Sequence, residues 1–152
     1  MSEVEVGEDE GLVRAVCTDK YDKDIGTIAP SLMMGPDTSV SRTKLIQLSD
    51  HWDLFRRCVQ KPEKERLLEV IATIDLPKLR KIAADHDAVT NSKHDIKVVV
   101  APNDCWKPRD GHAEIKGRIS RGLANKLIKE LVYHKEDKSK WAYDGDKLVA
   151  NS

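Results

Sequence analysis

The chain has 152 residues, and its 26 basic and 26 acidic side chains cancel to a formal net charge of zero. This balance argues against a dedicated nucleic-acid-binding protein, whose affinity depends on neutralising phosphates. With 39% apolar and 34% charged residues, the chain is long enough to bury the core of one globular domain without metal or disulfide staples.

The N-terminal segment is acidic: residues 1–10 contain no basic residue and include Glu3, Glu5, Glu8, Asp9 and Glu10. We expect this segment to be a disordered acidic tail, and residues 11–152 to form a single domain. In the alternative interpretation, the tail shields the basic surface of residues 107–140.

Alternating apolar residues predict several strands. Residues 62–74 are compatible with a helix or a strand, and the β-branched side chains at the end of this stretch favour a strand. The expected extended elements are strands at 11–17, 67–74, 96–101 and 112–116, short pieces at 25–34 and 39–42, and a C-terminal hairpin around Asp144 and Gly145.

Apolar residues spaced by three and four positions predict helices at residues 49–61, 75–85 and 120–132. Each of these helices has a side chain at its start that can accept backbone N–H groups: Ser49 or Asp50, Asp75, and Ser120. We therefore expect an α+β domain in which a small mixed sheet is flanked by about three helices.

Cysteine usage indicates free thiols. Cys17, Cys58 and Cys105 are odd in number and form no C-x-x-C pair, which is typical of reduced thiols rather than of a disulfide framework. The acidic N-terminus lacks the basic and apolar regions of a signal peptide, and no apolar run approaches the ~20 residues of a membrane helix. We expect a cytoplasmic protein that does not span a membrane.

One loop between a predicted strand and the last predicted helix concentrates reactive side chains. Cys105 and His112 suggest a thiol nucleophile and its base, in a setting made electropositive by Lys107 and Arg109. His112 and Glu114 have the H-x-E form of zinc deaminases, but the downstream P-C-x-x-C of that metal site is missing. Phosphate loops and dinucleotide-binding glycines are missing as well, so we expect no metal and no cofactor.

A second constellation spreads over several predicted strands. Arg14, the Ser39–Ser41 triplet and Glu114 follow the order Arg, Ser-x-Ser, Glu, which resembles the site of arginine-specific ADP-ribosyltransferases. In those enzymes the Arg and Ser position the dinucleotide, and the Glu stabilises the ribosyl cation. Arg80 and His86 resemble the R-x(4–6)-H arrangement of HEPN ribonucleases, although a single short helix would carry both residues here.

Four short segments resemble a loose group of small bacterial proteins. The segments are Leu-Val-Arg-Ala at 12–15, Gly-Thr-Ile-Ala-Pro at 26–30, Ser-Val-Ser-Arg at 39–42 and Gly-His-Ala-Glu-Ile-Lys-Gly at 111–117. That group has an Arg-Ala strand, a Ser-Val-x-Arg turn and a His-Ala-x-Ile segment before a short helix. The resemblance implies a compact prokaryotic accessory protein of a toxin–antitoxin or phage-defence system.

The sequence supports two functional hypotheses. In the first, the protein is a cytoplasmic interaction module, and an exposed loop binds a protein partner through Trp106, Arg109, Lys107 and Cys105. In the second, it is a small enzyme acting on a nucleotide or nucleic acid, with candidate catalytic residues His112, Glu114, Arg14 and Ser41. The enzyme requires these residues to meet in one cleft, whereas the module requires the Trp106 indole to face solvent.

Overall fold

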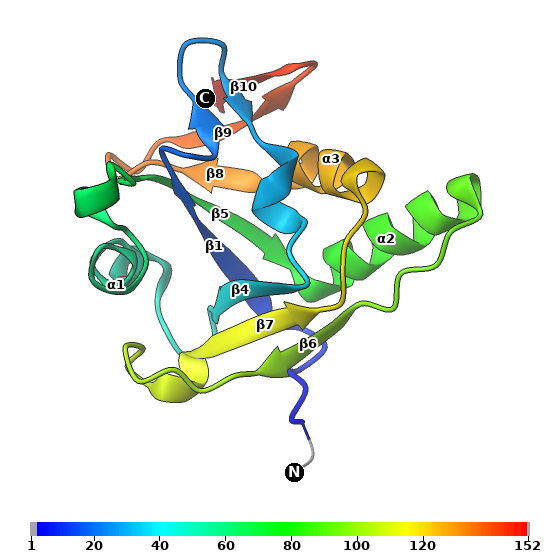
Figure 1. The fold of residues 1–152 in the computed structure, drawn as a ribbon, viewed down its shortest axis with the longest axis horizontal. Coiled ribbons are helices and arrows are strands. Elements are labelled where there is room, and N and C mark those ends of the chain that lie inside the picture. The colour runs from blue at the N-terminus through cyan, green and yellow to red at the C-terminus, as the bar shows by residue number, and fades with distance from the viewer. Residues whose placement is uncertain (1–2, 152) are drawn as a thin grey trace.

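An eight-stranded antiparallel sheet runs through residues 3–151, the part of the chain that the computed structural model describes (Figure 1). The strand order in space is β10–β9–β8–β5–β1–β4–β7–β6. The strands are β1 Gly11–Cys17, β4 Asp37–Arg42, β5 Leu68–Asp75, β6 Lys97–Val100, β7 His112–Lys116, β8 Val132–His134, β9 Lys140–Asp144 and β10 Lys147–Asn151. A separate small hairpin consists of β2 Tyr21–Asp22 and β3 Thr27–Ile28.

The described residues also form three α-helices: α1 His51–Cys58, α2 Leu76–Thr90 and α3 Arg121–Glu130. Short 3₁₀ helices are η1 Pro30–Met33, η2 Leu48–Asp50, η3 Pro62–Lys64 and η4 Arg109–Gly111. The α+β class and the three helices are confirmed. The sheet has more strands than expected, and its pairings are antiparallel rather than mixed.

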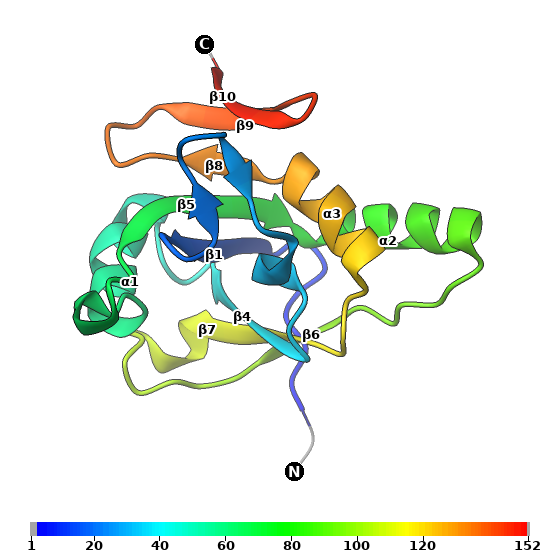
Figure 2. The same cartoon turned by 45° about the horizontal axis from the view of Figure 1, so that its top comes forward.

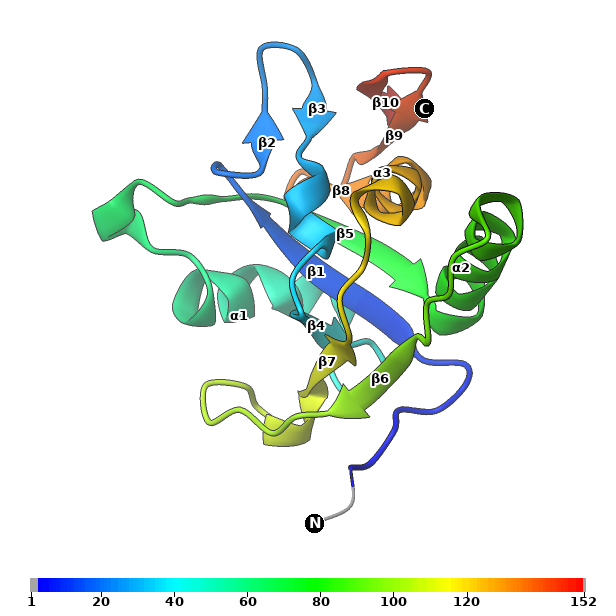
Figure 3. The same ribbon diagram turned by 45° about the vertical axis from the view of Figure 1, so that its right-hand side comes forward.

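The two faces of the sheet are covered by different elements. Along β1, side chains alternate between the faces, so that Leu12 and Val16 join a large core with α2, α3 and η1. Val13 and Ala15 point the other way and join a smaller core beneath α1. Figure 3 shows α1 on one side of β1 and β5, and α2 and α3 on the other. The smaller core is the one that the reactive loop joins.

Local patterns predicted most element boundaries. Asp75 Oδ1 accepts a hydrogen bond from Lys78 N at 2.8 Å, and Ser120 Oγ accepts one from Leu123 N at 3.3 Å, so both helix caps are confirmed. The ambiguous stretch at 62–74 begins with the 3₁₀ helix η3 and ends in the strand β5, as its β-branched side chains indicated. The predicted turn around Asp144 and Gly145 joins β9 to β10, which form the end of the sheet beside the C-terminus (Figure 2).

All three α-helices differ from prediction at one end or both. Helix α1 spans His51–Cys58 rather than 49–61, because Leu48–Asp50 forms the 3₁₀ helix η2, and the Asp50 side chain makes no capping hydrogen bond.

Helix α2 continues to Thr90, where Thr90 Oγ1 donates to His86 O and Asn91, in the left-handed region, ends the helix with its N–H bonded to Asp87 O. Helix α3 ends at Glu130, because Leu131 turns into extended conformation. Val132 then pairs with Thr73 on β5 and starts β8, a strand that the sequence placed inside the helix.

Residues 3–10 do not form the expected disordered tail; Met1 and Ser2 lie outside the described residues. Val6 N donates to Val98 O at 3.0 Å, and Val100 N donates to Val4 O at 2.7 Å, so this segment extends the sheet beyond β6. Glu10 is fully buried, and its carboxylate accepts hydrogen bonds from Arg42 Nε at 2.8 Å and from the backbone N–H of Lys44 at 3.1 Å.

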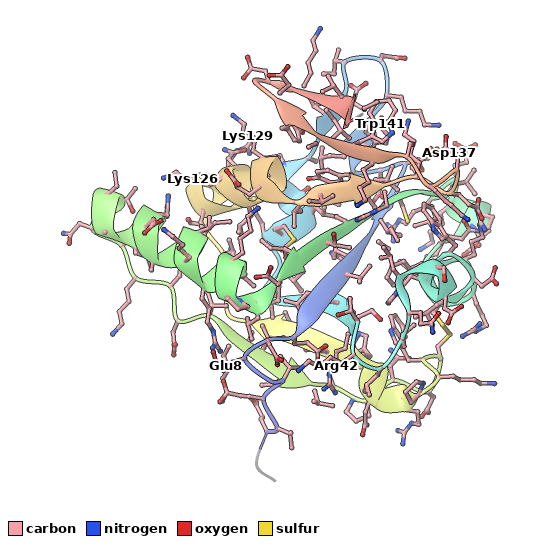
Figure 4. The ribbon with its side chains drawn as sticks, turned by 180° about the vertical axis from the view of Figure 1, so that it is seen from behind. Glu8, Arg42, Lys126, Lys129, Asp137 and Trp141 are labelled. Carbon is pink, nitrogen blue, oxygen red and sulfur yellow. A yellow bond between two sulfur atoms is a disulfide. The ribbon has the colours of Figure 1, made fainter. Side chains whose placement is uncertain are left out.

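The acidic segment also shields cations, but mostly outside residues 107–140; within that range, the pKa of Lys116 is raised by Glu114, then by Asp37 and least by Glu3. Its exposed carboxylates pair with cations on β6, on α2 and in the turn after β4: Glu3 with Lys97, Glu8 with Arg80, and Asp9 with Lys44. Figure 4, a view from behind, shows Glu8 and Arg42 on either side of this segment.

Candidate functional site

The loop that was expected to present Trp106 to solvent folds inward. Asn103 makes a tight turn, since its backbone carbonyl accepts from Trp106 N at 3.0 Å and its side-chain Oδ1 accepts from Cys105 N at 2.9 Å. The indole is only 4% exposed and packs in the smaller core against Phe55 and Ile46. The prediction of an exposed Trp106 is therefore wrong, because the apolar area that the indole buries outweighs the polarity of its neighbours.

Ser41 lies beneath Trp106 and is fully buried. Its hydroxyl accepts a hydrogen bond from Trp106 Nε1 at 3.2 Å and contacts His51 Nε2 at 2.7 Å. Burial lowers the pKa of His51, although hydrogen bonds to the carbonyls of Leu48 and Gln47 oppose the shift. The neutral ring accepts the Ser41 proton, and the three side chains satisfy one another. Ser41 therefore holds the core together and is not available to a substrate.

Cys105 is not a free thiol. It forms a disulfide with Cys58 at the end of α1, 47 residues earlier, whereas Cys17 is free and buried. The expectation of three reduced thiols is wrong, because the odd count and the wide spacing do not show which cysteines the fold brings together. The disulfide excludes Cys105 as a nucleophile and removes the thiol argument for a cytoplasmic protein.

Lys107 and Arg109 are exposed, as the interaction hypothesis requires. Arg109 Nε pairs with Asp104 Oδ1 at 2.7 Å within the same loop. Lys107 borders a hollow of about 300 Å³ that also contains Asp50 and Asp53. Both cations are accessible to a partner. The Trp106 indole is buried, however, and cannot be the aromatic anchor of such a surface.

His112 is buried at the start of β7, with 6% of its surface exposed. Its Nδ1 lies 2.6 Å from the carbonyl oxygen of Ala101, and its Nε2 contacts Ser39 Oγ. The Trp106 ring packs edge-on against the imidazole, with 4.6 Å between the ring centroids. Glu114, two residues on, binds Lys116 Nζ at 3.1 Å instead of His112.

Arg14 occupies the place where β1 and β4 separate. These strands pair at Leu12–Arg42 and Val13–Ser41. Beyond that point the Arg14 side chain bridges the gap: Nη1 donates to Ser39 O at 3.2 Å, and Nε donates to Leu32 O at 3.3 Å. Burial lowers the pKa of the guanidinium, while the nearby Cys17 and Asp19 raise it. Within residues 3–151, no carboxylate lies within 4.0 Å of this cation.

A pocket of about 260 Å³ opens at this gap, and we call it the Arg14 pocket. No acidic side chain lies among its lining residues, which are Arg14, Ala15, Ser39, Val40, Phe55, Cys58, Val59, Lys61, Arg66, Asn103 and Trp106. Arg66 is paired with Asp19 at 3.4 Å. The pocket combines an apolar wall with a positive rim, which suits a small anion that carries an apolar part.

The predicted catalytic residues are only partly brought together. Arg14 lines the pocket, and His112 reaches its wall through Ser39, whereas Ser41 and Glu114 do not line it. In the Ser39–Ser41 triplet, the accessible serine is Ser39, whereas the sequence analysis selected Ser41 as the candidate. Alternation along β4 puts both serines on one face, and only the position of Trp106 decides which of them is covered.

Lys61, Arg66 and Asn103 were also missed. Lys61 and Arg66 belong to the connection between α1 and β5, and only the fold brings them beside Asn103, which lies in the loop before β7. Within the described residues, no group of three or more His, Cys, Asp or Glu side chains is placed to hold a metal ion. In the same part of the chain, every helix is too short or too polar to cross a membrane. Comparison of the chain with models of protein families, with curated proteins and with solved structures finds no match.

Proposed function

We propose that the protein binds a small amphipathic anion, a carboxylate or phosphate with an apolar body, in the Arg14 pocket. The observation that carries this proposal is the partly buried Arg14 guanidinium, which has no carboxylate partner among residues 3–151. A cation removed from water without a counter-ion is costly, and an anionic ligand would supply the missing charge. The planar guanidinium also suits carboxylate and phosphate oxygens.

The rest of the pocket fits such a ligand. Lys61 adds positive charge at the rim, beside the Arg66–Asp19 ion pair, while Phe55 and Trp106 offer an apolar wall. Its volume of about 260 Å³ lies just below the usual range for small-molecule sites. The ligand is therefore no larger than a single ring with one or two substituents.

The lining of the Arg14 pocket bears on one form of the enzyme hypothesis, the transfer of ADP-ribose. Glu114 binds Lys116 and does not line the pocket. Transfer of ADP-ribose requires that carboxylate beside the ligand, so the pocket gives this chemistry no support.

The test is titration of the protein with benzoate and with phenyl phosphate, followed calorimetrically, with neutral benzamide as the control ligand. We expect the anions to bind and benzamide to bind much more weakly. Arg14→Gln should weaken anion binding by about tenfold or more, as expected for loss of a charge-assisted hydrogen bond. Arg118→Gln is the matched control, because Arg118 is exposed and lies outside the pocket.

Lys61→Gln provides a second variant if Arg14→Gln does not fold, since Lys61 is exposed at the rim. It should weaken binding of the anions and leave the fold intact. The proposal is wrong if neither anion binds the wild-type protein, or if the pocket variants bind as well as Arg118→Gln.

A further inference from the structure

Residues 3–151 contain two pairs in which a serine hydroxyl contacts a histidine ring, and the pairs differ in access. Ser41 and His51 are both fully buried. Ser39 contacts His112 in the same way but is partly exposed and lines the Arg14 pocket. Only this second pair has a hydroxyl that a bound ligand can reach.

The hydrogen bonds of His112 define where its protons lie. Nδ1 is 2.6 Å from Ala101 O, and a carbonyl oxygen only accepts, so Nδ1 carries the ring proton. In the neutral ring, Nε2 then has a free lone pair and accepts the proton of Ser39 Oγ. A serine hydroxyl that donates to a histidine, itself oriented by a third group, is the arrangement of an activated nucleophile.

A hydrogen-bond donor stands on the same pocket. Asn103 lines it, and the Oδ1 of its amide is already engaged by Cys105 N at 2.9 Å. This bond fixes the amide orientation, and Nδ2 has no acceptor within residues 3–151. Such a donor is suited to stabilising the negative charge that develops on a carbonyl oxygen under attack.

We propose that Ser39 and His112 hydrolyse carboxylic esters of small anionic alcohols or phenols, an inference that rests on the anion-binding role of the Arg14 pocket. Ser39 Oγ forms a bond to the ester carbonyl carbon while its proton passes to His112 Nε2. The carbon–oxygen bond to the leaving group then breaks, and His112 returns the proton to that oxygen. Water cleaves the acyl-serine by the same sequence, releasing the acid and restoring Ser39.

In this arrangement each residue has a separate task. Arg14 pairs with the anionic group of the substrate and positions the ester, and Asn103 Nδ2 donates to the carbonyl oxygen. The apolar wall formed by Phe55 and Trp106 receives the ring of the leaving group. Because Ala101 belongs to the backbone, no carboxylate is needed to orient His112.

The test uses 4-acetoxybenzoate as substrate and phenyl acetate as its neutral counterpart. Release of 4-hydroxybenzoate is followed by absorbance, and the acetylated protein is digested and sequenced by mass spectrometry. We expect turnover of 4-acetoxybenzoate, slower turnover of phenyl acetate, and an acetyl group on Ser39. Ser39→Ala should lose acyl transfer, and His112→Gln should lower the rate by about 100-fold or more.

Benzoate binding, measured in the same variants, separates this inference from the proposed function. Ser39→Ala should still bind benzoate, and Ser49→Ala should match the wild-type rate, because Ser49 is exposed and outside the pocket. If the wild-type protein binds benzoate but Ser39→Ala hydrolyses the ester as fast as wild type, the esterase inference is wrong. The proposal that the Arg14 pocket binds anions is then still supported. If benzoate does not bind to the wild-type protein, both the anion-binding proposal and the esterase inference are wrong. Equal rates for the two esters would overturn the anionic preference.

Discussion

Trp106 Nε1 donates a hydrogen bond to Ser41 Oγ at 3.2 Å, which joins the reactive loop to the C-terminal end of β4 across 65 residues of sequence. His51 Nε2 completes the group at 2.7 Å from the same hydroxyl. These polar atoms lie inside an apolar core with Phe55 and Val13, where each must find its partner within the protein. The loop is thus held inward by packing and by hydrogen bonding together.

Ser41→Ala removes the partner of two buried groups at once. We expect the free energy of unfolding to fall by about 1–3 kcal/mol for each of the Trp106 and His51 nitrogens left without a partner. Urea denaturation followed by tryptophan fluorescence measures the loss, with exposed Ser49→Ala as the control. A change within about 0.5 kcal/mol, as for an ordinary surface substitution, would show that this hydrogen-bonded group does not stabilise the core.

The elements that the sequence predicted well are those whose signals are local. The alternation at residues 11–17 and 112–116 gave the bounds of β1 and β7, and the caps Asp75 and Ser120 gave the starts of α2 and α3. A strand or a helix start is specified by neighbours within a few residues. Such a signal fails where a distant strand competes, as at Val132, which pairs with Thr73 on β5 instead of continuing α3.

The candidate site was harder to predict, because its properties depend on residues far apart in sequence. Composition suggested that Trp106 is exposed, yet its burial is decided by α1 and by Ser41. The pairing of Cys58 with Cys105 likewise depends on where α1 ends. Arg14 was a candidate from the sequence, but only the separation of β1 from β4 gives it a pocket.

Glu10 and Glu8 form a matched pair for testing the role of the N-terminal segment. Glu10 is fully buried against Arg42, whereas the Glu8 side chain is 82% exposed beside Arg80. Glu10→Gln leaves Arg42 largely buried without its counter-charge, so we expect a loss of about 3–5 kcal/mol in the free energy of unfolding. Glu8→Gln should cost less than about 1 kcal/mol. Urea denaturation measures both, and similar small losses would mean that the segment is not anchored at Glu10.

The Cys58–Cys105 disulfide should stabilise the protein by restricting its unfolded state. The crosslink spans 47 residues, for which chain entropy predicts a contribution of about 4 kcal/mol. We expect a reducing agent to lower the urea midpoint of the wild-type protein. The double variant Cys58→Ser, Cys105→Ser should have the lower midpoint from the start and not respond to the reductant. An identical midpoint for oxidised and reduced wild type would contradict a stabilising role.

Acidification should destabilise the protein through His51. Burial lowers the pKa of His51 in the folded chain below the ordinary value of 6.5. Between these two pKa values the unfolded state binds more protons than the folded state, so the free energy of unfolding falls as the pH decreases below about 6.5. His134, whose pKa is lowered by burial and by the charge of Lys140, contributes in the same direction.

The contribution of His51 is isolated by measuring the urea midpoint from about pH 7.5 to about pH 5 in the wild-type protein, in His51→Gln and in His134→Gln. We expect His51→Gln to be less stable at neutral pH but to lose less stability on acidification, because glutamine cannot take up the proton. His134→Gln should reduce the pH dependence by a smaller amount, since His134 is only partly buried. An unchanged pH dependence in His51→Gln would mean that the folded protein accommodates a charged imidazole beside Ser41 and Trp106.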